Sequence, residues 1–121
     1  MAGRLSGKRI LVIEDEYYIA ADLQRVLGAE GAVVIGPSGH LADGLELATQ
    51  PLDAALLDVN LHGEPSFAIA ERLHAAQVPY TLITGYDSWA IPEGYREVPR
   101  LTKPFVMARL IDAVERMVAV E

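Results

Sequence analysis

Residues 53 to 63 read Asp-Ala-Ala-Leu-Leu-Asp-Val-Asn-Leu-His-Gly. The apolar run from Ala54 to Leu57 stops abruptly at an acid, Asp58. An uninterrupted aliphatic run of this length is typical of a strand that is covered on both faces, as in a parallel sheet. Open parallel sheets bind their ligands at the carboxyl ends of their strands. The stretch therefore predicts a buried central strand that ends at a candidate functional carboxylate.

The composition excludes several classes of protein. The chain has 121 residues, of which 51% are hydrophobic, so it is long enough for one folded domain and is not typical of a disordered protein. It has no cysteine, which excludes disulfides and thiolate sites and fits a reducing compartment. A net charge of -7 without a basic run disfavours nucleic-acid or anionic membrane surfaces. No apolar segment reaches the roughly 18 residues of a membrane span, and the segment Ile10 to Ile13 is too short for a signal peptide. We expect a soluble, cytoplasmic protein with a single domain over residues 1–121 and no output domain.

Strand and helix patterns alternate along the chain. Strands are predicted at residues 8–15, 32–35, 54–58 and 79–84, and a short fifth strand within 96–102. Helices are predicted at about 16–27, 40–49 and 105–118, with another that follows the loop at 63–65 and ends near residue 77. Such alternation predicts a five-stranded parallel sheet in a three-layer α/β/α sandwich with right-handed crossovers. The second strand is expected to stop at the loop-forming residues 36–39.

The segment between the last two strands has the weakest pattern. Pro92, Gly94 and Pro99 interrupt any long helix there, so the fourth helix is expected to be short or irregular. The prediction is limited to one helical turn around residues 88–91.

Five polar residues follow four of the predicted strands: Glu14 and Asp15, then Asp58, Thr84 and Lys103. Each has a simpler interpretation when taken alone. An acid can cap a helix or a loop, a threonine is common in strands, and a loop lysine is usually solvated. Because the carboxyl ends of parallel strands meet at one edge, their joint occurrence indicates a single site.

The chemistry of these side chains narrows the role of the site. Crowded carboxylates repel one another and raise their pKa values unless a cation joins them, and hard oxygen ligands suit Mg²⁺. Lys103 can pair with a phosphoryl group, and the Thr84 hydroxyl can donate a hydrogen bond to it. A carboxylate can accept a phosphoryl group to form an acyl phosphate, and Asp58 is the central candidate.

Four short motifs carry a family resemblance. They are Ile-Glu-Asp-Glu at 13–16, Leu-Leu-Asp-Val-Asn-Leu at 56–61, Ile-Thr-Gly at 83–85 and Leu-Thr-Lys-Pro-Phe at 101–105. In this order and at these spacings, they make the chain resemble the receiver domains of two-component response regulators over nearly its full length. The resemblance implies a flavodoxin-like receiver fold with strand order 2-1-3-4-5.

The resemblance also implies a function. Asp58 would take a phosphoryl group from a phosphohistidine on a sensor histidine kinase or a histidine phosphotransfer protein, assisted by Thr84 and Lys103. The domain would then signal through contacts with a downstream protein, which the sequence does not identify, or act as a phosphate sink. It would be a switch that assists its own phosphorylation and dephosphorylation rather than an enzyme. The Lys103–Pro104 bond is expected to be cis, which would point the lysine into the site.

The resemblance to receiver domains also implies which residues bind the metal ion. Asp15 and Asp58 would bind Mg²⁺ directly, and Asn60 would bind it through its backbone carbonyl. Glu14 would act through a bound water. Two alternatives are less favoured. An Mg²⁺-dependent aspartyl-phosphate phosphatase is disfavoured because Asn60 stands in place of its second acid, and an unphosphorylated interaction module is disfavoured by the intact set of acids.

Two positions depart from the common receiver pattern. His62 stands where a proline is frequent, and a solvent-facing loop histidine is the favoured interpretation over a metal ligand. The three histidines, His40, His62 and His74, lie in different segments without metal-ligand spacing. Arg100 stands where many receivers carry the aromatic residue of a Tyr/Thr switch, so that switch cannot operate in its usual form.

The end of the fourth strand offers another conformational device. Leu-Ile-Thr-Gly-Tyr at 82–86 resembles the receivers known as FAT GUY regulators. Gly85 and Tyr86 are therefore expected to take part in a response in which the chain from 86 to 99 becomes ordered around Thr84. The aromatic residues Tyr86, Trp89 and Tyr95 either form a partner surface or cover a thin part of the core, and both interpretations stay open.

Overall fold

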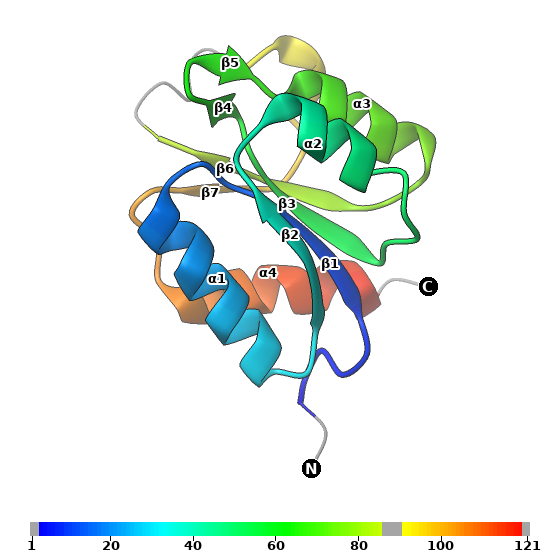
Figure 1. The fold of residues 1–121 in the computed structure, drawn as a ribbon, viewed down its shortest axis with the longest axis vertical. Coiled ribbons are helices and arrows are strands. Elements are labelled where there is room, and N and C mark those ends of the chain that lie inside the picture. Colours follow the sequence, from blue (N-terminus) through cyan, green and yellow to red (C-terminus); the bar gives the residue numbers. More distant parts are fainter. Residues whose placement is uncertain (1–2, 86–90, 120–121) are drawn as a thin grey trace.

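The structure is a computed structural model, and it describes residues 3–85 and 91–119. Its central sheet consists of β1 (Arg9–Ile13), β2 (Val33–Ser38), β3 (Ala54–Asp58), β6 (Tyr80–Thr84) and β7 (Arg100–Thr102). All neighbours in the sheet pair in parallel, in the order β2-β1-β3-β6-β7 (Figure 1). The predicted five-stranded parallel sheet with order 2-1-3-4-5 is confirmed.

Within the described residues, four α-helices cover the two faces of the sheet. They are α1 (Tyr17–Ala29), α2 (Leu41–Leu47), α3 (Phe67–Ala75) and α4 (Met107–Ala119). The helices α2 and α3 lie on one side, and α1 and α4 lie on the other (Figure 1). This arrangement confirms the three-layer α/β/α sandwich. Among the helices that the structure describes, none combines the length and hydropathy needed to span a bilayer.

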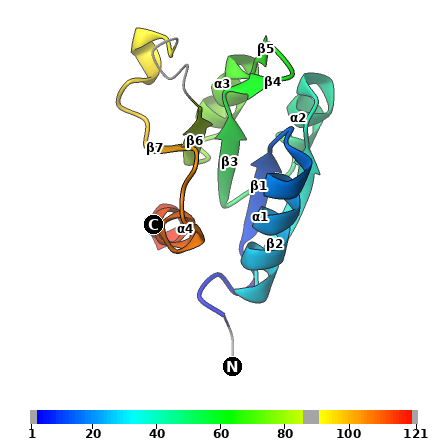
Figure 2. The same cartoon turned by 90° about the vertical axis from the view of Figure 1, so that its left-hand side faces the viewer.

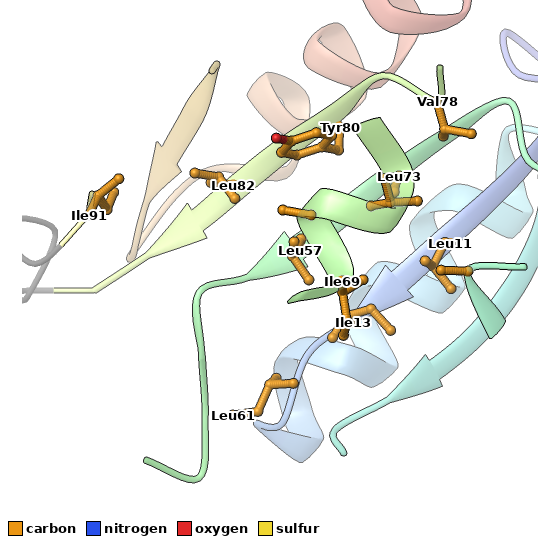
Figure 3. Packing of buried hydrophobic residues seen from close by; sticks show 13 residues of the cluster. Leu11, Ile13, Leu57, Leu61, Ile69, Leu73, Val78, Tyr80, Leu82 and Ile91 are labelled. Atoms are coloured by element: carbon orange, nitrogen blue, oxygen red, sulfur yellow. The ribbon is translucent and has the colours of Figure 1, made fainter. Parts of the chain in front are cut away.

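The central strand β3 contributes to both layers of the core. Its five residues are all buried. Because side chains alternate across a strand, Leu56 packs in the cluster under α1 and α4, whereas Leu57 packs in the cluster under α2 and α3. Figure 3 shows Leu57 beside Ile69 and Leu73 of α3. Coverage on both faces explains why the strand is apolar at successive positions up to its terminal acid.

The parallel arrangement gives the site its position. In Figure 2 the arrowheads of β1 and β3 point to the same end of the molecule, where two short strands also lie. These strands, β4 (Asn60–Leu61) and β5 (Glu64–Pro65), form an antiparallel hairpin directly after β3. The sequence predicted only a loop at 63–65, because two-residue strands carry no periodic signal.

The predicted end of the second strand was wrong. β2 continues through Gly36 and Pro37 to Ser38, and its register against β1 shifts between Leu11 and Ile13. An irregularity on an edge strand tolerates glycine and proline, since one side of the strand has no partner to bond. The Gly-Pro pair therefore marks an irregular stretch of β2 instead of the start of the loop.

The segment before β7 is irregular, as expected, in the part that the structure describes. A 3₁₀ turn, η2 (Glu93–Tyr95), replaces a longer helix there. The Tyr95 ring packs on Phe67 with ring centroids 4.7 Å apart, so Tyr95 covers the core beside α3. The expected helical turn at 88–91 lies almost wholly outside the described residues, as do Tyr86 and Trp89.

Replacement of Leu57 by Ala tests how much the packing of the central strand contributes to the stability of the fold. The side chain is fully buried, so Leu57→Ala is expected to lower the free energy of unfolding by about 2–5 kcal/mol. Urea unfolding followed by circular dichroism measures this loss. The control is Val106→Ala, whose side chain is 62% exposed and whose change should stay within about 0.5 kcal/mol. Equal losses for both variants would contradict the described packing.

Candidate functional site

Three carboxylates gather at the carboxyl ends of β1 and β3. The two strands are neighbours, with Ile13 opposite Leu57, and Glu14 and Asp15 follow Ile13 directly. One carboxylate oxygen from each of Glu14, Asp15 and Asp58 lies within 4.8 Å of the others. Glu14 is 2% exposed and Asp58 is 4% exposed. The structure thus brings together the three acids that the sequence singled out.

Burial and crowding change the acidity of these groups in different directions. Burial raises the pKa of the Glu14 carboxyl to about 8, and the adjacent Asp58 carboxyl adds to this effect. Burial also raises the pKa of Asp58. For Asp15 burial acts in the same direction, but hydrogen bonds, above all those from the His62 backbone N–H and with Asp58, together outweigh it, and the pKa is lowered. Three acids in this space therefore favour a cation between them.

Lys103 supplies a positive charge to the cluster. Its Nζ donates to Asp58 Oδ2 at 3.0 Å, to Glu14 Oε2 at 3.0 Å and to Glu16 Oε1 at 2.6 Å. Burial opposes the charged form, but the hydrogen bonds to Glu16 and Glu14 prevail and raise the pKa of the ammonium group. The Lys103–Pro104 bond is cis, as expected. The sequence did not indicate Glu16 as a partner of Lys103, because Glu16 directly precedes α1 and does not lie at the end of a strand.

Two buried polar atoms beside this cluster have no hydrogen-bond partner among the described residues. They are Thr84 Oγ1, at the end of β6, and Glu14 Oε1. Thr84 is held in place by the backbone, because its carbonyl accepts a 2.7 Å bond from the Lys103 N–H. A buried polar atom without a partner costs about 1–3 kcal/mol. These two atoms therefore fit a polar ligand bound at the site.

The hairpin after β3 fixes Asp58 from its backbone side. The Asn60 N–H donates to Asp58 Oδ1 at 3.0 Å, and Asn60 Oδ1 accepts from the Gly63 N–H at 2.7 Å. The hydroxyl of Ser66, which is fully buried, donates to the Asp58 carbonyl at 2.6 Å. Sequence reasoning missed Ser66. Its place before α3 is typical of a helix cap, but the hydroxyl turns back to the strand and makes no cap bond.

These side chains surround an open cleft of about 310 Å³. The cleft is lined by Asp15, Glu16, Asp58, Val59, Asn60, His62, Gly63, Gly85 and Lys103. A carboxylate, a lysine ammonium and the edge of a hairpin thus face the same small space.

Comparison with known proteins shows what this arrangement resembles. No family model matches the chain. It is 36% identical over 118 residues to the transcriptional regulatory protein TcrA of Mycobacterium tuberculosis, a match that covers 89% of this chain and 45% of TcrA. The chain spans about half the length of the curated relatives it matches.

Solved structures match over the whole fold. SdrG from Sphingomonas melonis superposes with a TM-score of 0.80 at 33% identity, over 98% of this chain and 99% of SdrG. The receiver domain of the sensor histidine kinase PA1611 from Pseudomonas aeruginosa superposes with a TM-score of 0.77 at 23% identity, over 94% of this chain and 99% of that domain, which shows a shared fold. The chain belongs to the receiver-domain family of the response regulators. The resemblance drawn from the four motifs is confirmed.

The acidic cluster of this receiver fits Mg²⁺. The PA1611 receiver was solved with a magnesium ion coordinated in its active-site cleft. Here the corresponding chemistry is present in three clustered carboxylates, one of which, Glu14, has a buried oxygen without a partner among the described residues. Such oxygen donors are those that Mg²⁺ prefers.

The conformational residues of the receiver are placed only in part. Gly85 lines the cleft, whereas Tyr86 lies outside the described residues, so the likeness to the FAT GUY group stays a prediction. Arg100, at the position of the usual switch aromatic, is half-buried and donates from its guanidinium to the Arg96 carbonyl at 3.1 Å. This contact ties Arg100 to the loop before β7.

Removal of the Ser66 hydroxyl tests the support of Asp58. Ser66→Ala leaves the buried Asp58 carbonyl without this donor, and the free energy of unfolding should fall by about 1–3 kcal/mol. Thr49→Ala is the matched control, because the exposed Thr49 hydroxyl also donates to a backbone carbonyl, that of Glu46 at 2.6 Å. Its effect should stay within about 0.5 kcal/mol. Chemical denaturation measures both, and a Ser66→Ala variant as stable as the control would refute the assigned bond.

Proposed function

We propose that Asp58 accepts a phosphoryl group from a phosphohistidine of a partner protein and that the domain passes the signal on through protein contacts. The observation that carries the proposal is the position of the Asp58 carboxylate at the cleft, with one oxygen bonded to the Asn60 N–H and the other to Lys103 Nζ. Burial raises the pKa of Asp58, and the N–H and the ammonium act against this by favouring the carboxylate form, which is the form that can attack phosphorus.

Phosphoryl transfer from the histidine to Asp58 needs no further reactant. An Asp58 oxygen forms a bond to phosphorus as the bond from phosphorus to the histidine nitrogen breaks, and that nitrogen keeps the electron pair. The product on this chain is an acyl phosphate. Lys103 neutralises negative charge on the phosphoryl oxygens, and the Thr84 hydroxyl, which has no partner among the described residues, donates to one of them.

Magnesium has a defined place in this proposal. Glu14, Asp15, Asp58 and the backbone carbonyl of Asn60 would hold the ion, with Glu14 acting through a water. When bound, the ion supplies positive charge that offsets the carboxylates and the incoming phosphoryl oxygens.

The partner and the response follow from the same chemistry. The donor is a sensor histidine kinase or a histidine phosphotransfer protein, and the receiver acts on a downstream protein or as a phosphate sink. The response passes through Gly85 and Tyr86 into the segment up to residue 99. A phosphatase is disfavoured, because Asn60 uses its side-chain oxygen to accept the Gly63 N–H instead of offering an acid to the cleft.

A small-molecule phosphodonor tests the acceptor directly. Wild type treated with acetyl phosphate and Mg²⁺ should gain about 80 Da, the mass of one phosphoryl group, in intact-mass spectrometry, and Asp58→Asn should gain none. Asp53→Asn is the control, since Asp53 precedes the other end of β3 and bonds the Arg9 N–H. It should label like the wild type. Persistent labelling of Asp58→Asn would remove the proposal.

Magnesium should also stabilise the fold. At a concentration about ten times its dissociation constant, an ion that binds only the folded state adds about 1.4 kcal/mol, which raises Tm by roughly 5 °C. Asp15→Asn should lose this rise in differential scanning fluorimetry. Asp43→Asn, which changes an exposed acid on α2, should keep it. A rise of the same size in Asp15→Asn would place the ion elsewhere.

A further inference from the structure

Two histidines from distant segments lie side by side, and one of them, His62, lines the cleft. His40 follows β2 and stands directly before α2, and His62 lies in the turn between β4 and β5. Their ring centroids are 5.8 Å apart, with an angle of 31° between the ring planes. Their separation in the sequence predicted no shared metal site, and the fold brings them together all the same.

Asp15 lies against both histidine segments. Its Oδ2 accepts the His62 N–H at 2.9 Å, and the His62 ring atom Nδ1 is 3.6 Å from the same oxygen. On the other side, Gly39 approaches so closely that an added Cβ would lie 2.9 Å from the Asp15 Cα. The neighbouring Ser38 carbonyl accepts the Glu14 N–H at 2.9 Å. His62 therefore contacts the Asp15 carboxylate directly, whereas on the His40 side it is the neighbouring residue Gly39 that packs against the Asp15 backbone.

The donor types differ from those of the magnesium cluster. Imidazole nitrogens suit zinc and similar transition metals, whereas Mg²⁺ takes oxygen ligands. Two imidazoles on one tetrahedral zinc ion, with Zn–N bonds of about 2.0 Å, have ring centres roughly 5 Å apart. The observed 5.8 Å is close to this spacing. The ligand atoms of the two histidines and Asp15 do not all lie within 4.8 Å of one another in the structure. Both histidines are exposed, and the His62 side chain is 61% exposed, so their rings are free to rotate toward a common ion.

We infer that His40, His62 and Asp15 form a binding site for a transition-metal ion of the zinc type at the rim of the cleft. Three protein ligands leave the fourth tetrahedral position to a water molecule. The site shares Asp15 with the proposed magnesium cluster. Zinc bound there therefore competes with Mg²⁺ for Asp15, and this consequence rests on the proposed function, whereas zinc binding itself does not.

Zinc binding to the full chain tests the site without any phosphodonor. Competition against a fluorescent zinc chelator, in buffer without Mg²⁺, should show one ion bound per chain. His40→Ala and His62→Ala should each weaken zinc binding roughly tenfold or more, and Asp15→Asn should weaken it as well. His74→Ala is the matched control, because His74 is an exposed histidine on α3 outside the pair. It should bind zinc like the wild type.

The acid variants separate this site from the magnesium cluster. Glu14→Gln and Asp58→Asn should weaken zinc binding less than either histidine variant, since both residues lie beside Asp15 but neither is a ligand of the inferred site. If these two variants lose zinc and the histidine variants keep it, the ion sits in the acidic cluster and the inference is overturned. It is also overturned if all variants bind alike. Either failure leaves the Asp58 labelling result untouched, and a failure of labelling leaves the zinc measurement untouched.

Discussion

The arrangement of this receiver depends on the ion pairs between Lys103 and the buried acids at the ends of β1 and β3. Parallel pairing of the two strands places Glu14 and Asp58 next to each other, and burial removes the water that would otherwise screen them. Lys103 reaches both carboxylates from the end of β7, on the other side of β6. A single ammonium offsets only part of the charge of three acids. That imbalance favours a further cation at the cluster.

Different elements around the cluster hold different site residues in place. The β4–β5 hairpin and the Ser66 hydroxyl hold the backbone at Asp58, while β6 and the Lys103 N–H hold Thr84. Because these hydrogen bonds come from the backbone and from a buried side chain, they fix the positions of the polar site residues before a ligand binds. Such preorganisation agrees with the proposed phosphoryl transfer, since reorganisation during a reaction would raise its barrier.

Much of the fold and of the site was predictable from residues close in sequence. The apolar run at 54–57 reflects coverage of β3 on both faces, and the acid that ends it lies at the carboxyl end of the sheet. In the same way Thr84 ends β6, and Glu14 and Lys103 directly follow β1 and β7. The contacts that escaped prediction join distant segments. Ser66 bonds the Asp58 carbonyl because the β4–β5 hairpin returns the chain to the end of β3. His40 meets His62 because β2 and β3, which precede them, flank β1 in the same sheet. The Gly36-Pro37 pair was misread for another reason, since turn chemistry also suits an irregular edge strand.

The Gly36-Pro37 pair also affects whether strands of two copies of this protein can pair with each other. β2 is one edge of the sheet, and Pro37 has no N–H to offer a further strand. At the opposite edge β7 is three residues long, and Pro99 precedes it. Proline and short length are the usual means by which exposed edges are kept from intermolecular strand pairing and fibrous aggregation. The sheet is therefore a poor template for strand addition at either edge, which leaves helices and loops as the surfaces on which partners can dock.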